Sequence, residues 1–74
     1  MDIRWKIGNR IKQLREEKDI AQRDLALNAD LDRSYIAGIE SGQRNVSIVN
    51  IEKIAAALGI SLKDFFDDEQ FTKP

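Results

Sequence analysis

The residues that break helices are scarce in this chain. Its one proline is the last residue, Pro74, and glycine occurs at only four positions. Because proline and glycine disfavour the interior of a helix more than any other residues, their scarcity leaves room for helices almost everywhere. We therefore predict an all-α chain.

Apolar residues recur at helical spacing in the first segment. Ile7, Ile11 and Leu14 stand at i, i+4 and i+7 among charged residues. This spacing predicts an amphipathic helix over about residues 4–17. Four further helices are expected at residues 21–28, 33–40, 48–58 and 62–66.

The starts and ends of these helices carry typical capping residues. Asp32 and Ser47 precede the third and fourth helices as N-caps, whose side-chain oxygens accept hydrogen bonds from free backbone amides. Ser61 and Asp64 match a capping box, and Gly59 stands where a left-handed residue ends the fourth helix. That helix also carries an apolar stripe that we expect in the core, formed by Ile48, Ile51, Ile54, Ala55 and Leu58.

Composition excludes several classes of protein. The chain has 74 residues, enough for one small domain, and its 42% hydrophobic content supplies a core. It has neither cysteine nor histidine, so disulfides and thiolate or imidazole metal sites are excluded and the commonest general base is missing. We expect no catalytic residues, no metal and no cofactor. No apolar run is long enough for a membrane span or a signal peptide, which indicates a cytoplasmic protein.

The overall charge argues against a generic polyanion binder. Twelve Lys and Arg oppose thirteen Asp and Glu, and the sequence pI is about 5.3, whereas nucleic-acid-binding domains usually have a pI above about 9. Positive charge is nevertheless concentrated locally, because residues 1–15 carry five basic groups against one acidic group. Any nucleic-acid interface must therefore be local.

Residues 22–41 have the pattern of two short helices joined by a tight turn. The small residue Ala26 stands where the helices would cross, and Leu31 follows the turn as an apolar plug. Ile36 and Ile39, three residues apart, face the core. This arrangement is the geometry of a helix-turn-helix.

The opposite side of the third helix is polar or small. In the major groove of DNA, Arg33 could bond guanine in a bidentate manner, Ser34 could bond several base edges, and the Ala37 methyl could touch a thymine methyl. Gly38 costs about 0.5–1 kcal/mol relative to alanine, which a close approach to DNA or crowding against another helix would explain. We predict that these four residues face the bases.

The motif Gln22-x-x-Leu25-Ala26, Leu31 and Ile36-x-x-Ile39-Glu40-x-Gly42 resembles the Cro/repressor-type (XRE family) helix-turn-helix over about residues 7–66. Two further strings are most similar to the controller proteins of restriction–modification systems, namely Leu31-Asp32-Arg33-Ser34-Tyr35-Ile36 and Arg44-Asn45-Val46-Ser47-Ile48.

The resemblance implies a compact five-helix, lambda-repressor-like domain at residues 1–66, with a polar tail at 67–74. It also implies a sequence-specific transcriptional regulator that binds a palindromic operator in double-stranded DNA as a homodimer. The family usually has Thr or Ser where Ala21 stands, so the second helix lacks an N-cap worth about 1 kcal/mol. Asp19 and Asp30 replace the usual Gly or Asn of two turns, and Asp tolerates left-handed geometry.

The resemblance assigns roles to single residues as well. It implies an ion pair between Arg15 and Glu40, and a dimer surface at Val49, Phe66 and Phe71. The alternatives are a Phe66 that closes the core and a Phe71 that is disordered, and for Tyr35 a ring that only packs against Leu31 or the second helix. The residues implied to bind phosphates are Gln22, Arg23, Tyr35, Gln43, Arg44 and Asn45.

A different class of function stays open at this stage. An antitoxin, or a phage or mobile-element repressor, would have another protein as its main partner, with the tail as a docking segment. An enzyme is more remote, because the helical pattern places no pair of carboxylates in a cleft. Nothing in the pattern indicates a small-molecule effector.

Overall fold

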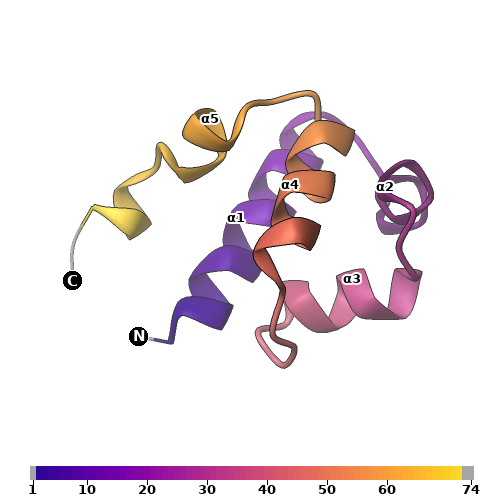
Figure 1. The fold of residues 1–74 in the computed structure, drawn as a ribbon, viewed down its shortest axis with the longest axis horizontal. Coiled ribbons are helices and arrows are strands. Elements are labelled where there is room, and N and C mark those ends of the chain that lie inside the picture. The colour runs from indigo at the N-terminus through magenta and orange to yellow at the C-terminus, as the bar shows by residue number, and fades with distance from the viewer. Residues whose placement is uncertain (1, 73–74) are drawn as a thin grey trace.

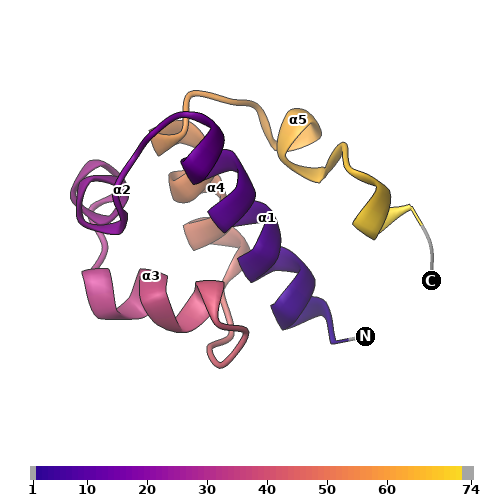
Figure 2. The ribbon, with the colours of Figure 1, turned by 180° about the vertical axis from the view of Figure 1, so that it is seen from behind.

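The computed structural model describes residues 2–72, and within that range the regular structure is entirely helical. α3 lies at one edge of the molecule and α5 near the opposite edge (Figures 1 and 2). α1 packs against α3, α2 contacts both α3 and α4, and α4 contacts α5. The elements are α1 (Ile3–Glu17), α2 (Gln22–Ala29), α3 (Arg33–Glu40), α4 (Ile48–Ala57), α5 (Leu62–Phe66) and the short 3-10 helix η1 (Glu69–Phe71).

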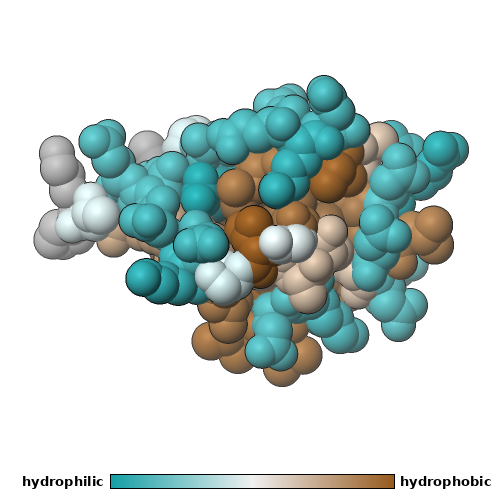
Figure 3. Space-filling model, turned by 90° about the horizontal axis from the view of Figure 1, so that it is seen from above, coloured by the Kyte–Doolittle hydropathy of each residue, from teal (hydrophilic) through white to brown (hydrophobic). Residues whose placement is uncertain are grey.

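All five α-helices contribute to one hydrophobic core. The apolar periodicity of α1 is confirmed, since Ile7, Ile11 and Leu14 are buried. Seen from above, polar side chains form most of the surface and hydrophobic atoms show between them (Figure 3). The largest side chains with no contact to solvent are Ile11, Leu25, Ile36, Ile39, Ile54 and Phe65.

The assignment of Ile48 to the core is wrong. Along the stripe of α4 the exposed fraction rises from 0% at Ile54 to 8% at Ile51 and 75% at Ile48. Ile48 is the first residue of the helix, one turn before Ile51. The stripe therefore leaves the core at the N-terminal end of α4, and Ile48 lies on the surface.

Most of the expected helix ends are present. The Ser47 and Ser61 hydroxyls accept hydrogen bonds from the amides of Asn50 and Asp64. Gly59 has a φ of 76°, and the two turn aspartates, Asp19 and Asp30, also have a positive φ. Asp32 occupies the N-cap position of α3, but its carboxylate makes no capping bond. Its side chain is exposed instead, where water can solvate it.

One glycine sets how closely α1 approaches α3. A Cβ atom at Gly8 would overlap the backbone carbonyl oxygen of Ile39. Because that oxygen belongs to the main chain of α3, it cannot move aside as a flexible side chain can. Gly8 therefore permits the contact that brings the two helices together.

Arg10 anchors the C-terminal segment to α1. It is only 8% exposed, and its Nε donates to the carbonyl oxygen of Phe65 at 2.7 Å while Nη2 donates to that of Asp64 at 2.8 Å. Nη1 bonds the side chains of Gln13 and Asp68 at 3.2 and 3.3 Å. A buried guanidinium needs such acceptors, so the end of α5 and the start of η1 are held in place.

The segment after α5 is more regular than its polar composition indicates. Asp68 caps η1 by accepting a hydrogen bond from the amide of Gln70. Phe71, in η1, packs edge-on against Phe66 with ring centroids 5.2 Å apart. The last two residues of the expected tail, at positions 73 and 74, lie outside the described range. No helix within residues 2–72 is both long and apolar enough to span a membrane.

Replacing Arg10 tests this anchor. Arg10→Ala leaves two carbonyl oxygens and the Asp68 carboxylate without their donor, so we expect the free energy of unfolding to fall by about 3 kcal/mol. Arg10→Lys keeps the charge but not the planar set of donors, so its free energy of unfolding should lie between those of the wild type and Arg10→Ala. Urea denaturation followed by circular dichroism measures both. An Arg10→Ala variant as stable as the wild type would contradict the anchoring role.

Candidate nucleic-acid interface

α2 and α3 form a helix-turn-helix. α2 packs against α3, and the chain reverses at Asp30, whose φ and ψ are 57° and 46°. The amide of Leu31 donates to the carbonyl oxygen of Ala26 at 2.9 Å, which closes the end of α2. Ala26 is 3% exposed at the crossing, as its small side chain predicts.

α3 has an inner and an outer face. Ile36 and Ile39 are completely buried on the inner face. Arg33 and Ser34 are exposed, whereas Ala37 and Gly38 are partly covered. Within residues 2–72 no carboxylate lies within salt-bridge distance of Arg33, so its donors remain free for an external acceptor.

Gly38 of α3 is partly covered by Arg44 of the following loop. A Cβ atom at Gly38 would overlap Cγ of Arg44, and the Arg44 guanidinium lies 5.3 Å from the centre of the Tyr35 ring. The Gly38 carbonyl also accepts hydrogen bonds from the amides of Gln43 and Arg44 at 3.0 and 3.2 Å. The close neighbour that the helical glycine accommodates is therefore the Arg44 side chain and not another helix.

Two of the expected phosphate ligands have partners inside the protein. Nε2 of Gln22 donates to Glu40 at 3.1 Å. The Tyr35 hydroxyl accepts a hydrogen bond from Asn50 at 3.0 Å and donates to the Asn45 carbonyl at 3.4 Å. The Tyr35 ring is half-buried and packs against the core. Gln22 keeps its Oε1 oxygen without a protein donor among the described residues, whereas the Tyr35 hydroxyl is engaged on both sides. The phosphate roles of both residues stay predictions.

The other expected phosphate ligands lie at the surface near α3. Arg23 follows the first residue of α2 with its side chain 83% exposed, and its only ionic neighbour among the described residues is Asp24 at 3.9 Å. Gln43 and Asn45 are exposed in the loop after α3 together with Arg44. The start of α2, the outer face of α3 and this loop therefore belong to one continuous stretch of chain, residues 22–45.

An ion pair joins the end of α3 to α1, and its guanidinium also bonds the chain just before α2. Arg15 Nε and Nη2 donate to the two carboxylate oxygens of Glu40 at 2.8 and 2.9 Å, and Nη1 donates to the Ile20 carbonyl at 2.8 Å. The Glu40 side chain is 4% exposed. The hydrogen bonds to Glu40 raise the pKa of Arg15 above its ordinary value, so the guanidinium stays charged.

Residues of α1, α4 and α5 leave large apolar side chains exposed at the surface. Val49 and Phe66, two of the residues expected at a dimer interface, are 59% and 38% exposed, whereas Phe71 is partly buried beneath Phe66. Ile3 and Ile48 are exposed as well. Ile3 and Phe66 also line an open groove of about 320 Å³. The sequence pattern does not reveal that Ile3 and Ile48 are exposed, because helical periodicity does not show where a helix extends beyond its neighbours.

These features define the class of protein. The helix-turn-helix family model matches residues 11–65, and the chain belongs to this family. The chain is similar to Control protein C.MunI from Mycoplasma sp, with 53% identity over 68 residues, 90% of this chain and 92% of that protein. The XRE-type resemblance and its controller-protein subgroup are thereby confirmed.

Solved structures agree with these sequence relationships. The restriction–modification controller protein C.AhdI from Aeromonas hydrophila is 49% identical, with a TM-score of 0.81 over 85% of this chain and 96% of its own. The controller protein C.Esp1396I, solved as a tetramer in complex with its natural 35 base-pair operator, is 40% identical. Its TM-score is 0.86 over 90% of this chain and 88% of its own.

Gly38→Ala tests whether Gly38 matters for the stability of the fold or for the position of Arg44. Alanine favours the helix by about 0.5–1 kcal/mol, which offsets the displacement of a flexible Arg44 side chain. We therefore expect the free energy of unfolding to change by less than about 1 kcal/mol, while affinity for DNA falls because Arg44 is displaced from Tyr35. Urea denaturation and fluorescence anisotropy with labelled DNA measure the two quantities.

Gly8→Ala is the matched control, because the same methyl group then meets a main-chain carbonyl. It should destabilise the fold by about 1–3 kcal/mol. A Gly38→Ala variant that binds DNA like the wild type would show that the position of Arg44 does not matter.

Proposed function

We propose that this protein is a sequence-specific transcriptional regulator that binds a palindromic operator as a homodimer and controls a restriction–modification system. One observation carries the proposal: the outer face of α3 presents Arg33 and Ser34 to solvent on a helix-turn-helix scaffold. The similarity to controller proteins over most of the chain supports the biological setting. Its place of action is the cytoplasm, and we assign it no catalytic role.

α3 is the recognition helix in this proposal. Arg33 donates to the O6 and N7 atoms of a guanine, and Ser34 bonds a neighbouring base edge. Ala37 offers a methyl group for contact with thymine. Since only two polar side chains can read bases, the shape and deformability of the DNA supply much of the remaining specificity.

Phosphate contacts fix the register of α3 in the groove. The first amides of α2 have no partner inside the helix, so Gln22 and Arg23 meet a phosphate at the positive end of the helix dipole. Gln43, Arg44 and Asn45 meet the backbone on the other side of α3. Such contacts orient a protein on the duplex and carry no sequence information themselves.

A second copy of the chain covers the apolar surface of Ile3, Ile48, Val49 and Phe66. These four large apolar side chains are exposed, and two of them, Ile3 and Phe66, line one groove. A contiguous exposed apolar patch marks an interaction site. A two-fold dimer would place its recognition helices in successive major grooves about 34 Å apart. The operator should then be palindromic.

Arg33→Ala tests base reading. We expect affinity for a DNA fragment from upstream of the protein's own reading frame to fall by about 1–3 kcal/mol, with little change for random DNA. Lys53→Ala, which removes one exposed positive charge from α4, is the matched control. Equal losses in the two variants would mean that Arg33 contributes charge only, and no loss would exclude it from the interface.

Val49→Asp tests the dimer. Val49 is 59% exposed, so the variant should fold normally, but it places a charge in the apolar interface. We expect sedimentation velocity to show a monomer at concentrations where the wild type is a dimer, with an unchanged circular dichroism spectrum. A wild-type protein that is itself monomeric, or a dimeric Val49→Asp variant, would contradict this assignment.

A further inference from the structure

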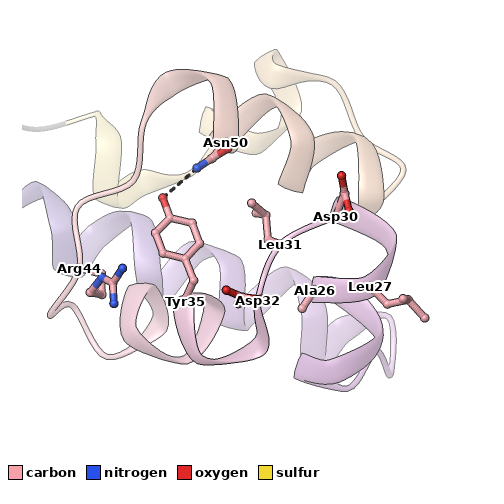
Figure 4. A pocket seen from close by; sticks show the side chains of 8 residues that line it. All are labelled: Ala26, Leu27, Asp30, Leu31, Asp32, Tyr35, Arg44 and Asn50. Carbon is pink, nitrogen blue, oxygen red and sulfur yellow. Dashed lines mark hydrogen bonds between the residues drawn. The ribbon is translucent and has the colours of Figure 1, made fainter.

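A hydrogen bond between Tyr35 of α3 and Asn50 of α4 crosses an open pocket of about 440 Å³ beside the helix-turn-helix (Figure 4). Asp32 and Arg44 line the same pocket. Nothing in the sequence pattern assigns Asn50 a role. Its amide nevertheless touches the one aromatic side chain of the proposed recognition helix.

The direction of this hydrogen bond determines what the Tyr35 hydroxyl can do. Nδ2 of Asn50 can only donate, so the Tyr35 oxygen accepts at 3.0 Å. The phenolic proton must therefore point elsewhere. Its acceptor within residues 2–72 is the Asn45 carbonyl at 3.4 Å, which is long for an O–H···O hydrogen bond. The proton is weakly held and available to a stronger acceptor.

Asn50 itself is held firmly. Its backbone N–H donates to the Ser47 hydroxyl at 3.1 Å, which caps α4. The next residue, Ile51, is buried in the core. The carboxamide of Asn50 therefore projects from a fixed turn of helix, and its hydrogen bond holds the Tyr35 ring in place. That ring lies beneath the Arg44 guanidinium at 5.3 Å.

We propose that Asn50 is a positioning residue for the DNA interface, which acts through Tyr35. It keeps the phenolic proton free to donate to a DNA phosphate oxygen, a charged acceptor that forms a stronger bond than the distant carbonyl. It also keeps the ring in place under Arg44. This inference rests on the proposed function, because it requires that the face of α3 binds DNA.

A double-mutant cycle separates action through Tyr35 from a general structural role. The variants are Asn50→Ala, Tyr35→Phe and the double substitution, and the readout is anisotropy with the upstream DNA fragment. We expect Tyr35→Phe to lose about tenfold in affinity and Asn50→Ala about fivefold, as for single hydrogen bonds to charged and neutral partners. The double variant should also lose only about tenfold, because Asn50 has no effect once the hydroxyl is gone.

Two further variants test the direction of the bond. Asn50→Gln keeps an amide donor in a pocket with room for one more methylene and should recover part of the affinity. Asn50→Asp has nearly the same shape, but its carboxylate only accepts hydrogen bonds. It would therefore accept the hydrogen bond from the Tyr35 hydroxyl, and the affinity should not recover. Asn28→Ala, an exposed asparagine on α2, is the matched control and should bind like the wild type.

The outcomes distinguish this inference from the proposed function. Losses that multiply to about fiftyfold in the double variant, or an Asn50→Ala variant that binds like the wild type, would overturn the role of Asn50 alone. If the wild type fails to prefer the upstream fragment over random DNA, the proposed function fails and this inference fails with it. Thermal melts run on every variant ensure that the folded proteins are compared.

Discussion

The ion pair between Arg15 and Glu40 determines where the outer face of α3 points. It is bidentate and nearly buried, and its guanidinium also bonds the carbonyl of Ile20, just before α2. The end of α1, the start of α2 and the end of α3 therefore meet at one cluster of charge, and Gly8 lets the main chains of α1 and α3 touch nearby. Removing either charge would leave the other buried without a partner, which costs more than the pair contributes by its attraction alone. The position of the candidate interface thus depends on groups that do not themselves face DNA.

Local features of the fold could be predicted from the sequence, and features that depend on distant partners could not. The caps at Ser47 and Ser61, the left-handed turns and the inner face of α3 follow from nearest neighbours along the chain. The anchor at Arg10 could not be predicted, because its acceptors are carbonyls of α5 more than fifty residues away. Asn50 was missed for the same reason, since an isolated polar residue on a helix gives no signal until its partner across the pocket is known. Ile48 was misplaced because periodicity describes a face of a helix but not where its neighbours end.

The near-zero net charge is compatible with DNA binding because some of the acidic residues pair with arginines elsewhere in the fold, whereas two arginines at α3 have no acidic partner among the described residues. Within residues 2–72 Asp68 and Glu40 pair with Arg10 and Arg15 in the interior or near it. Aspartates also occupy two left-handed turns. Arg33 and Arg44 have no carboxylate partner in that range and lie on or beside α3. The formal net charge of −1 therefore describes the whole chain and not the face that we propose meets the duplex.

The salt dependence of DNA binding tests this view most directly. The logarithm of the association constant against the logarithm of salt concentration has a slope that reports how many phosphates a protein neutralises. We expect tight binding to the upstream fragment, weak binding to random DNA, and a slope per protomer that is smaller than for a strongly basic domain. Tight binding to random DNA with a steep slope would contradict a local, sequence-reading interface and would mean that the positive charges act as one broad surface.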